Sequence, residues 1–249
     1  MKRWAQNFFS AVAFLTRLPV PERVQAPPGD LSSSVVYFPL VGLLVSGGAI
    51  LLNHVLSRFA GQDVVVVAIL IFLVAITGGF HEDALADAAD GFGGGWGKDQ
   101  ILDIMHDSRV GSFGAIAVAL ALLARFVFLT NVPAPKLDSY LIAGQVACRW
   151  TALPLAFFLS PARAQSGQGA RVAGKISRLS LAVGTLLTAL ILAAALRWNA
   201  LWVGLATVAM TAASGAYYLR RIGGVTGDCL GATNQLTELA VYFAGVILR

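Results

Sequence analysis

The run "SFGAIAVALALLARFVFLTNV" (residues 112–132) decides the structural class of this protein. It holds twenty-one residues with a single charge, Arg125, and a helix of that length covers the roughly 30 Å hydrocarbon thickness of a bilayer. Lipid offers no hydrogen-bond partners, so the backbone of such a run satisfies its own donors and acceptors as a helix. The sequence therefore predicts a membrane-spanning helix at this position.

The rest of the 249-residue chain repeats this pattern. It is 57% hydrophobic and only 12% charged, whereas about a quarter of the residues in a soluble domain are charged. Further apolar runs lie at about 35–57, 63–80, 138–160, 179–196, 199–219 and 235–248, the last of them short enough to be tilted or partly interfacial. We expect an all-α, polytopic integral membrane protein with about seven transmembrane helices plus short cytoplasmic helices.

The N-terminal stretch "MKRWAQNFFSAVAFLTRLPVPERV" begins like a signal peptide. Asn7 and Arg17 interrupt its apolar centre and no small-residue cleavage motif follows, so an amphipathic helix at the membrane surface is favoured. Cys148 and Cys229 lie far apart without metal-site spacing, which predicts neither a disulfide nor a zinc site. We find no repeat or linker, and expect residues 1–249 to form one membrane-embedded domain.

The distribution of Lys and Arg predicts the orientation. Seven spans place the segments 1–34, 81–111, 161–178 and 220–234 on one side, and these hold twelve of the eighteen basic residues. The opposite side holds four, and two lie within spans. The first side is therefore expected to face the cytoplasm. The net charge of +5 mostly reflects this bias, and nothing indicates a nucleic-acid-binding module.

Seven of the thirteen acidic residues fall in the cytoplasmic segment 81–111. Asp83, Asp87 and Asp90 follow i, i+4, i+7 spacing, which places them on one face of a helix. A second set, at 99, 103 and 107, has i, i+4, i+8 spacing. The glycine-rich stretch 91–97 between them predicts a turn, as a flexible hinge or as a backbone cradle for phosphate. The pattern predicts two short helices with facing carboxylates.

So many anions beside a low-dielectric membrane repel one another strongly unless a cation is bound. Mg²⁺ is usually held by a few carboxylates together with substrate phosphates. We therefore expect a magnesium site, whose candidate ligands are Glu82, Asp83, Asp87, Asp90 and Asp103. The alternative is a solvated acidic loop. His81 and His106 flank the segment and are expected to hydrogen-bond to ligands rather than to bind metal.

Basic residues add candidates for binding a phosphate. Arg149 lies in the middle of a span, where a charge is usually functional or paired, and could contact substrate phosphate or a carboxylate. Arg125 lies nearer the outer end of its span and is expected to snorkel. The cytoplasmic loop 220–234 is flexible and charged, and it resembles half of a nucleotide site or an ordinary basic loop. The candidate substrate-binding residues are Lys175, Arg220, Arg221, Gly224 and Asp228.

Five motifs together resemble those of the cobalamin synthase family, the adenosylcobinamide-GDP ribazoletransferases, and they cover nearly the whole chain. They are "FLTRLPVP" (14–21), "FPLVGLL" (38–44), "TGGFHEDALAD" (77–87), "DIMHDSRVGSFG" (103–114) and "GGVTGDCLGA" (223–232). One departure is Ala84, where the family usually has glycine.

The resemblance implies a Mg²⁺-dependent, phosphotransferase-type reaction at the inner membrane. Adenosylcobinamide-GDP and α-ribazole, or its 5′-phosphate, would combine, release GMP and give adenosylcobalamin or its 5′-phosphate. Such transfers depend on positioning and charge neutralisation. In this interpretation Asp107 accepts the proton of the attacking hydroxyl, and Arg109 and Arg149 complete the catalytic set. The expected partners are these two substrates and membrane lipid.

Two other functions have to be weighed. The pairs Asp87-x2-Asp90 and Asp103-x3-Asp107 are similar to the signature of CDP-alcohol phosphotransferases, but the separation is shorter and the Ala-Arg between the pairs is absent. Release of CMP rather than GMP would favour that function. A cation transporter would place its acids near the middle of the bilayer. Here the acids are expected in a loop, which argues against transport.

Overall fold

The computed structural model describes residues 2–27, 31–162 and 176–248, and within these ranges it contains helices and no β-strand. The helices are α1 (Arg3–Leu15), α2 (Phe38–Leu56), α3 (Gln62–Thr77), α4 (Phe80–Gly94), α5 (Lys98–His106), α6 (Ser112–Asn131), α7 (Leu137–Trp150), α8 (Ala152–Phe158), α10 (Arg178–Leu196), α11 (Asn199–Ile222) and α12 (Gly227–Ile247). Short 3-10 helices are η1 (Glu22–Val24), η2 (Leu31–Ser33), η3 (Val35–Tyr37) and η4 (Ala134–Lys136).

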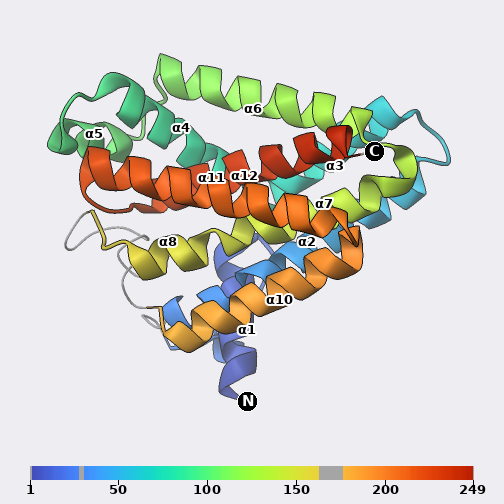
Figure 1. The fold of residues 1–249 in the computed structure, drawn as a ribbon, viewed down its shortest axis with the longest axis horizontal. Coiled ribbons are helices and arrows are strands. Elements are labelled where there is room, and N and C mark those ends of the chain that lie inside the picture. The colour runs from blue at the N-terminus through green and yellow to red at the C-terminus, as the bar shows by residue number, and fades with distance from the viewer. Residues whose placement is uncertain (1, 28–30, 163–175, 249) are drawn as a thin grey trace.

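The long helices form a bundle, with α2, α6, α7, α10, α11 and α12 running side by side (Figure 1). Five stretches of the described residues are long and apolar enough to cross a membrane. They are Leu31–Leu56, Ser112–Asn131, Ala134–Phe158, Arg178–Leu196 and Asn199–Ile222. Large apolar side chains such as Leu120, Leu186 and Leu205 point outward, as lipid-facing residues do. The expectation of an all-α, polytopic membrane protein is confirmed.

The number of spans differs from the expected seven. Helices α3 and α4 meet at an angle of 84°, and only together do they qualify as a sixth, broken span. The expected last span, 235–248, lies almost entirely within α12, which begins at Gly227, has twenty-one residues and is not among the stretches apolar enough to cross a membrane. Thr233, Asn234 and Gln235, at and before the start of that expected run, are buried. A hydropathy average missed the start of α12 because it counts these side chains as polar, although they are buried against protein.

Helix α4 is also deeper than its sequence indicates. Residues 81–111 were expected to lie outside the membrane, but α4 packs between α6 and α12. Near its start, Glu82 contacts Arg125, which lies well inside the long apolar helix α6. Near its end, Asp90 contacts the first residues of α6. Helix α4 therefore runs alongside α6 from its start to Arg125. The rest of the acidic segment, α5 and its flanking turns, lies at the end of the bundle (Figure 1).

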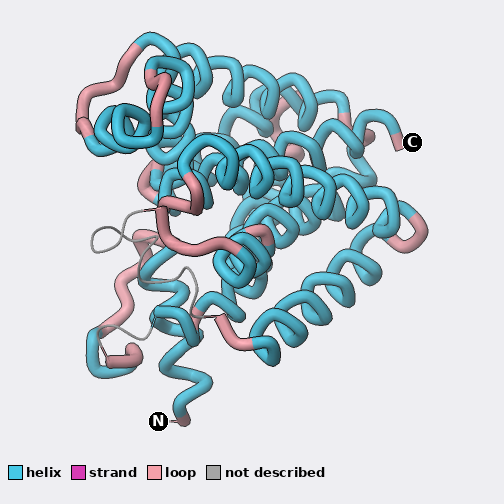
Figure 2. Tube along the Cα trace, turned by 60° about the vertical axis from the view of Figure 1, so that its left-hand side comes forward, coloured by secondary structure: helices cyan, strands magenta, loops and turns pink. Residues whose placement is uncertain are grey.

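The connections gather at the two ends of the bundle (Figures 1 and 2). One end holds α5, α8 and the turn between α11 and α12, where Pro161 and Val225 form an isolated bridge. Gly224 directly precedes this bridge, and a Cβ atom there would come within 2.4 Å of the Ser160 carbonyl oxygen. The expectation of a loop over 220–234 is wrong, because only residues 223–226 form a turn, which is held against the end of α8, and the rest belongs to α11 and α12. We call this end of the molecule the acidic end.

Candidate active site

A buried charge network links three helices in the middle of the bundle. The Arg125 guanidinium of α6 is 1% exposed and donates to Glu82 of α4 at 2.8 Å. It also lies 3.2 Å from a Glu238 oxygen of α12 and donates to Gln235. Two carboxylates compensate the cost of burying this cation. The expectation that Arg125 snorkels to the membrane surface is therefore wrong, because its carboxylate partners lie in the interior.

The network continues to Arg149 through an amide. Gln145 of α7 donates to Glu238 at 2.8 Å and to the Tyr242 hydroxyl at 3.0 Å. Its side-chain oxygen accepts a hydrogen bond from Arg149 at 2.6 Å. Gln145 therefore uses both ends of its amide to connect Glu238 with a second buried arginine. No motif of the sequence had singled out Gln145, because its partners lie far away in the chain.

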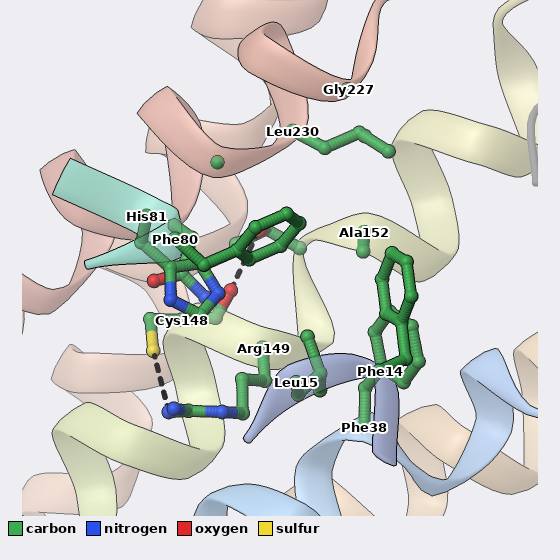
Figure 3. Close-up of a pocket in the computed structure, with 13 residues that line it drawn as sticks. Phe14, Leu15, Phe38, Phe80, His81, Cys148, Arg149, Ala152, Gly227 and Leu230 are labelled. Carbon is green, nitrogen blue, oxygen red and sulfur yellow. Dashed lines mark hydrogen bonds between the residues drawn. The ribbon is translucent and has the colours of Figure 1, made fainter. Parts of the chain in front are cut away.

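Arg149 is 2% exposed, and among the described residues it forms no ion pair with a carboxylate. One Nη donates to Gln145 and to the Cys148 sulfur, whereas the buried Nε has no hydrogen-bond partner. The side chain borders a small cavity of about 40 Å³ between α1, α2, α4, α7 and α12 (Figure 3). Phe14, Phe38 and Phe80 form its apolar wall. A buried cation with an unused donor at a cavity is suited to an anionic ligand.

Three acids gather along α4 beside the first turn of α12. Asp83 is exposed and Asp87 half-buried on one face of α4, as their spacing predicted. Asp83, Asp228 and Asp90 all lie near enough to Asp87 to repel its negative charge. In the described part of the chain, neither Asp83 nor Asp87 takes part in an ion pair. This group, Asp83, Asp87 and Asp228, is called the acidic triad below.

Close packing brings the two acidic helices together. Gly231 of α12 faces Ala84 of α4, and a Cβ atom at Gly231 would come within 2.3 Å of the Ala84 methyl group. Ala84 is the position at which the chain departs from the usual family sequence. Because Gly231 has no side chain, α4 and α12 approach closely at this contact, one turn of α12 after Asp228.

The acidic triad fits a hard divalent cation only if substrate completes the site. Within the described ranges, no three His, Cys, Asp or Glu side chains are close enough to hold a metal ion by themselves. Mg²⁺ usually takes one or two protein carboxylates and fills its remaining positions with water and phosphate oxygens. Asp83, Asp87 and Asp228 supply such oxygens, and their negative charges lie close enough to repel one another. The donor set is therefore suited to magnesium bound together with a phosphorylated ligand.

Asp90 has a different position from the acids before it. Its two oxygens accept backbone hydrogen bonds from Gly111 at 2.7 Å and Gly114 at 2.8 Å. These donors belong to the first turn of α6, so Asp90 caps that helix from another element. Both glycines leave room for the carboxylate, since a Cβ atom at either would come within 2.5 Å of it. The motif "VGSFG" thus has a structural explanation.

The second row of acids does not face the first. Helix α5 turns Ile101 and Met105 toward α4, and leaves Asp99 and Asp103 exposed. Asp103, Asp107 and Arg109 instead border an open cavity of about 560 Å³, with Asp90 at its edge. The Arg109 guanidinium donates to Asp107 and lowers the pKa of that carboxyl to about 2. While this pair persists, Asp107 is a weak proton acceptor.

The basic candidates separate in the structure. Arg221 donates to the carbonyl oxygens of Gly95 at 3.0 Å and Phe92 at 3.5 Å, and lies over the rings of Phe92 and Tyr217. It therefore holds the C-terminal end of α4. Arg220, the next residue, is exposed on another face of α11. Lys175 lies outside the described residues.

No sequence motif indicated several of the candidate functional residues. Gln145, Asn234 and Gln235 are all buried, the first and last in the charge network and Asn234 at the cavity beside Arg149. The spacing of positions 231, 234, 235, 238 and 242 is that of one helical face, so a polar stripe could have been read from the sequence. Hydropathy averages across both faces and conceals it.

Known proteins of one family match this chain over nearly its whole length. Residues 7–246 match the family model described as cobalamin-5-phosphate synthase. A protein of Shewanella pealeana called adenosylcobinamide-GDP ribazoletransferase is 35% identical over 100% of this chain and 98% of its own length. Proteins of the same name from Shewanella woodyi and Ralstonia nicotianae are 37% and 36% identical, over 94% and 97% of this chain and 93% and 95% of their own lengths. No solved structure matches the chain.

Proposed function

The chain belongs to the cobalamin-5-phosphate synthase family, and we propose that it acts as an adenosylcobinamide-GDP ribazoletransferase. The observation that carries this proposal is the match over nearly the full length of both proteins, at 34–37% identity, to relatives with that name. The acidic triad and the buried Arg149 offer what a transfer between two phosphorylated compounds requires. They provide oxygen ligands for a cation and a positive charge for phosphate.

In the proposed reaction, a ribose hydroxyl of α-ribazole or its 5′-phosphate attacks the phosphorus attached to the cobinamide arm. A new P–O bond forms, the pyrophosphate bond breaks, and GMP leaves with the bonding electrons. The hydroxyl proton passes to a base. The products are adenosylcobalamin, or its 5′-phosphate, and GMP. Because the bond that breaks links two phosphates, neutralising their charge is the main catalytic requirement.

We assign the acidic triad to binding Mg²⁺ with the pyrophosphate of the donor. When bound, the cation would neutralise charge on the bridging and leaving oxygens. Asp83, Asp87 and Asp228 would supply its carboxylate ligands, and the exposed edge of α4 at Asp83 leaves room for a large substrate to approach. Asp90 binds the start of α6 and so positions that helix beside this edge. Glu82 holds α6 further along, through its contact with Arg125.

Arg149 and Asp107 have more specific proposed roles. Arg149 approaches a substrate phosphate through its unused Nε–H, and Gln145 fixes the direction of its guanidinium. Asp107 accepts the hydroxyl proton only after Arg109 releases it to bind a substrate phosphate. The Asp107–Arg109 pair is exposed at the edge of a cavity, so this exchange of partners requires no rearrangement of the bundle.

The orientation of the protein in the membrane is inferred from the distribution of its Lys and Arg residues. The apolar helices support a membrane protein, and we infer that it lies in the cell inner membrane with its acidic end toward the cytoplasm. GDP-linked and phosphorylated substrates are available on that side. Single-cysteine variants at Ser108 should react with a permeant reagent in intact cells. Reaction with an impermeant reagent applied from outside would contradict this orientation.

The test of the function is a reaction with purified components. Protein in detergent, adenosylcobinamide-GDP, α-ribazole 5′-phosphate and Mg²⁺ should release GMP in equal amount to the corrinoid product. Asp99→Asn, an exposed change on α5, serves as the control that keeps activity. No GMP from folded protein would contradict the proposal. Release of CMP from a CDP-alcohol and a lipid diacylglycerol would replace it with the alternative phosphotransferase function.

A further inference from the structure

A third cavity is lined by helices other than α4 and α12, which carry the acidic triad. It is a groove of about 450 Å³ between α7, α8, α10 and α11, within the size range of small-molecule sites. Figure 1 shows α8 between the near ends of α10 and α11. The groove is lined mainly by apolar side chains, among them Trp150, Phe158, Leu181, Val208 and Leu219. Phe158 is 72% exposed there, with its ring edge-on to that of Phe157.

The groove extends along the helices toward the acidic end. Thr185 and Val208 line its deep part, and Leu181 and Leu219 line the part nearer that end. The deep part offers little for a polar ligand, because the Trp150 indole N–H already donates to the Thr185 hydroxyl at 2.9 Å. Its walls belong to stretches apolar enough to span the membrane, so the space opens to lipid tails rather than to water.

Each wall of the groove ends in an exposed arginine. On α10, Arg178 lies one turn before Leu181, on the same helical face. On α11, Arg220 lies one turn after Ala216 and continues the row formed by Ala212 and Ala216. Both arginines are exposed at the acidic end of the bundle. The groove therefore combines an apolar slot with two cations at its mouth.

From this arrangement we infer that the groove binds one anionic phospholipid, with an acyl chain against α8, α10 and α11 and its phosphate between Arg178 and Arg220. Basic pockets at the mouths of gaps between membrane helices are suited to anionic headgroups. An acyl chain matches the apolar lining of the slot, whereas the polar substrates of the proposed reaction do not. The inference is independent of the proposed function.

Native mass spectrometry of the detergent-purified protein tests this inference with phosphatidylglycerol and phosphatidylcholine as the added lipids. We expect one phosphatidylglycerol to remain bound in preference to phosphatidylcholine. Ala212→Phe fills the groove and should remove that lipid. Ala213→Phe is the matched control, since Ala213 is also exposed but does not line the groove. Equal lipid retention by the two variants would overturn the site.

The headgroup assignment has its own test. Arg178→Gln and Arg220→Gln should each weaken the preference for phosphatidylglycerol by about fivefold, the contribution of one basic residue near anionic lipid. Arg58→Gln, an exposed change at the opposite end of the bundle, should leave it unchanged. An unchanged preference in the Arg178 and Arg220 variants would overturn the proposal. These surface variants decide the question alone if Ala212→Phe does not fold.

Discussion

Glu82 and Asp83 are neighbours on α4, yet they belong to two regions with opposite electrostatics. Glu82 points into the bundle, where Arg125 neutralises it and Glu238 and Gln145 extend the network. Asp83 is exposed on the same side of the helix as Asp87, and neither of these two carboxylates forms an ion pair within the described residues. The paired charges of Glu82, Arg125 and Glu238 hold the helices together. The neighbouring carboxylates of Asp83 and Asp87 are suited to binding a cationic ligand. One helix serves both purposes because its faces differ.

The largest expected effect concerns the uncompensated region. Asp83→Asn and Asp87→Asn should each lower the rate of GMP release by about 10² to 10³, which is typical when one electrostatic contact to a transition state is lost. Thermal unfolding in detergent should change little, because removing either charge relieves repulsion. Asp87→Asn with wild-type turnover would place Asp87 outside the active site and remove the contrast with Glu82.

Changes in the buried network around Arg125 should lower the stability of the protein rather than its turnover. Arg125→Met leaves Glu82 and Glu238 without their cation, and breaking a buried pair in this way costs about 3–5 kcal/mol. We expect a lower unfolding temperature and poor yield of folded protein. Glu82→Gln and Glu238→Gln added to Arg125→Met should recover part of the loss, since no unpaired charge remains. An unchanged unfolding temperature in Arg125→Met would show that the network does not hold the helices.

Asp90 lies between the two regions, and its replacement should distinguish capping from metal binding. Asp90→Ala removes the acceptor for the Gly111 and Gly114 amides, and loss of a helix cap costs about 0.5–2 kcal/mol. We expect this decrease in unfolding free energy without Mg²⁺ present. Asp103→Ala, an exposed change nearby, is the control and should stay within about 0.5 kcal/mol of wild type. Equal stability of both variants would exclude the capping role.

The smallest effect is expected at Arg221. Its guanidinium stacks on aromatic rings and binds the last carbonyl oxygens of α4 rather than lining a phosphate site. Arg221→Gln should cost about 0.5–1 kcal/mol of stability, the range of an exposed cation–π contact, and leave the KM of both substrates near wild type. A large rise in KM for adenosylcobinamide-GDP, with unchanged stability, would return Arg221 to the substrate site predicted from the sequence.

Hydropathy located most of the fold because most spans face lipid on one side. Helices α6, α10 and α11 begin and end within a few residues of the expected runs. It failed at α4 and the first half of α12, whose polar residues are buried against each other. Burial of polar groups depends on partners brought together by folding, such as Glu82 and Arg125, which are 43 residues apart. A local average of one sequence contains no trace of such pairs.

The candidate site was predictable to a similar degree. The i, i+4 spacing of Asp83 and Asp87 correctly placed both on one face of a helix. It could not show that Asp90 turns to the start of α6, or that Asp103 faces away from α4, because both depend on how α5 and α6 pack. Asp228 was predicted to bind substrate from its loop, but its position beside Asp87 follows only from the contact of Gly231 with Ala84.

Calorimetric titration with Mg²⁺, in the presence and absence of adenosylcobinamide-GDP, tests most directly whether the acidic triad holds a cation on the donor. In wild-type protein we predict weak binding without the donor and clearly tighter, saturable binding with it. Asp87→Asn should lose the donor-dependent binding, and Asp99→Asn should keep it. If Asp87→Asn binds Mg²⁺ with the wild-type affinity in the presence of the donor, the acidic triad is not the metal site.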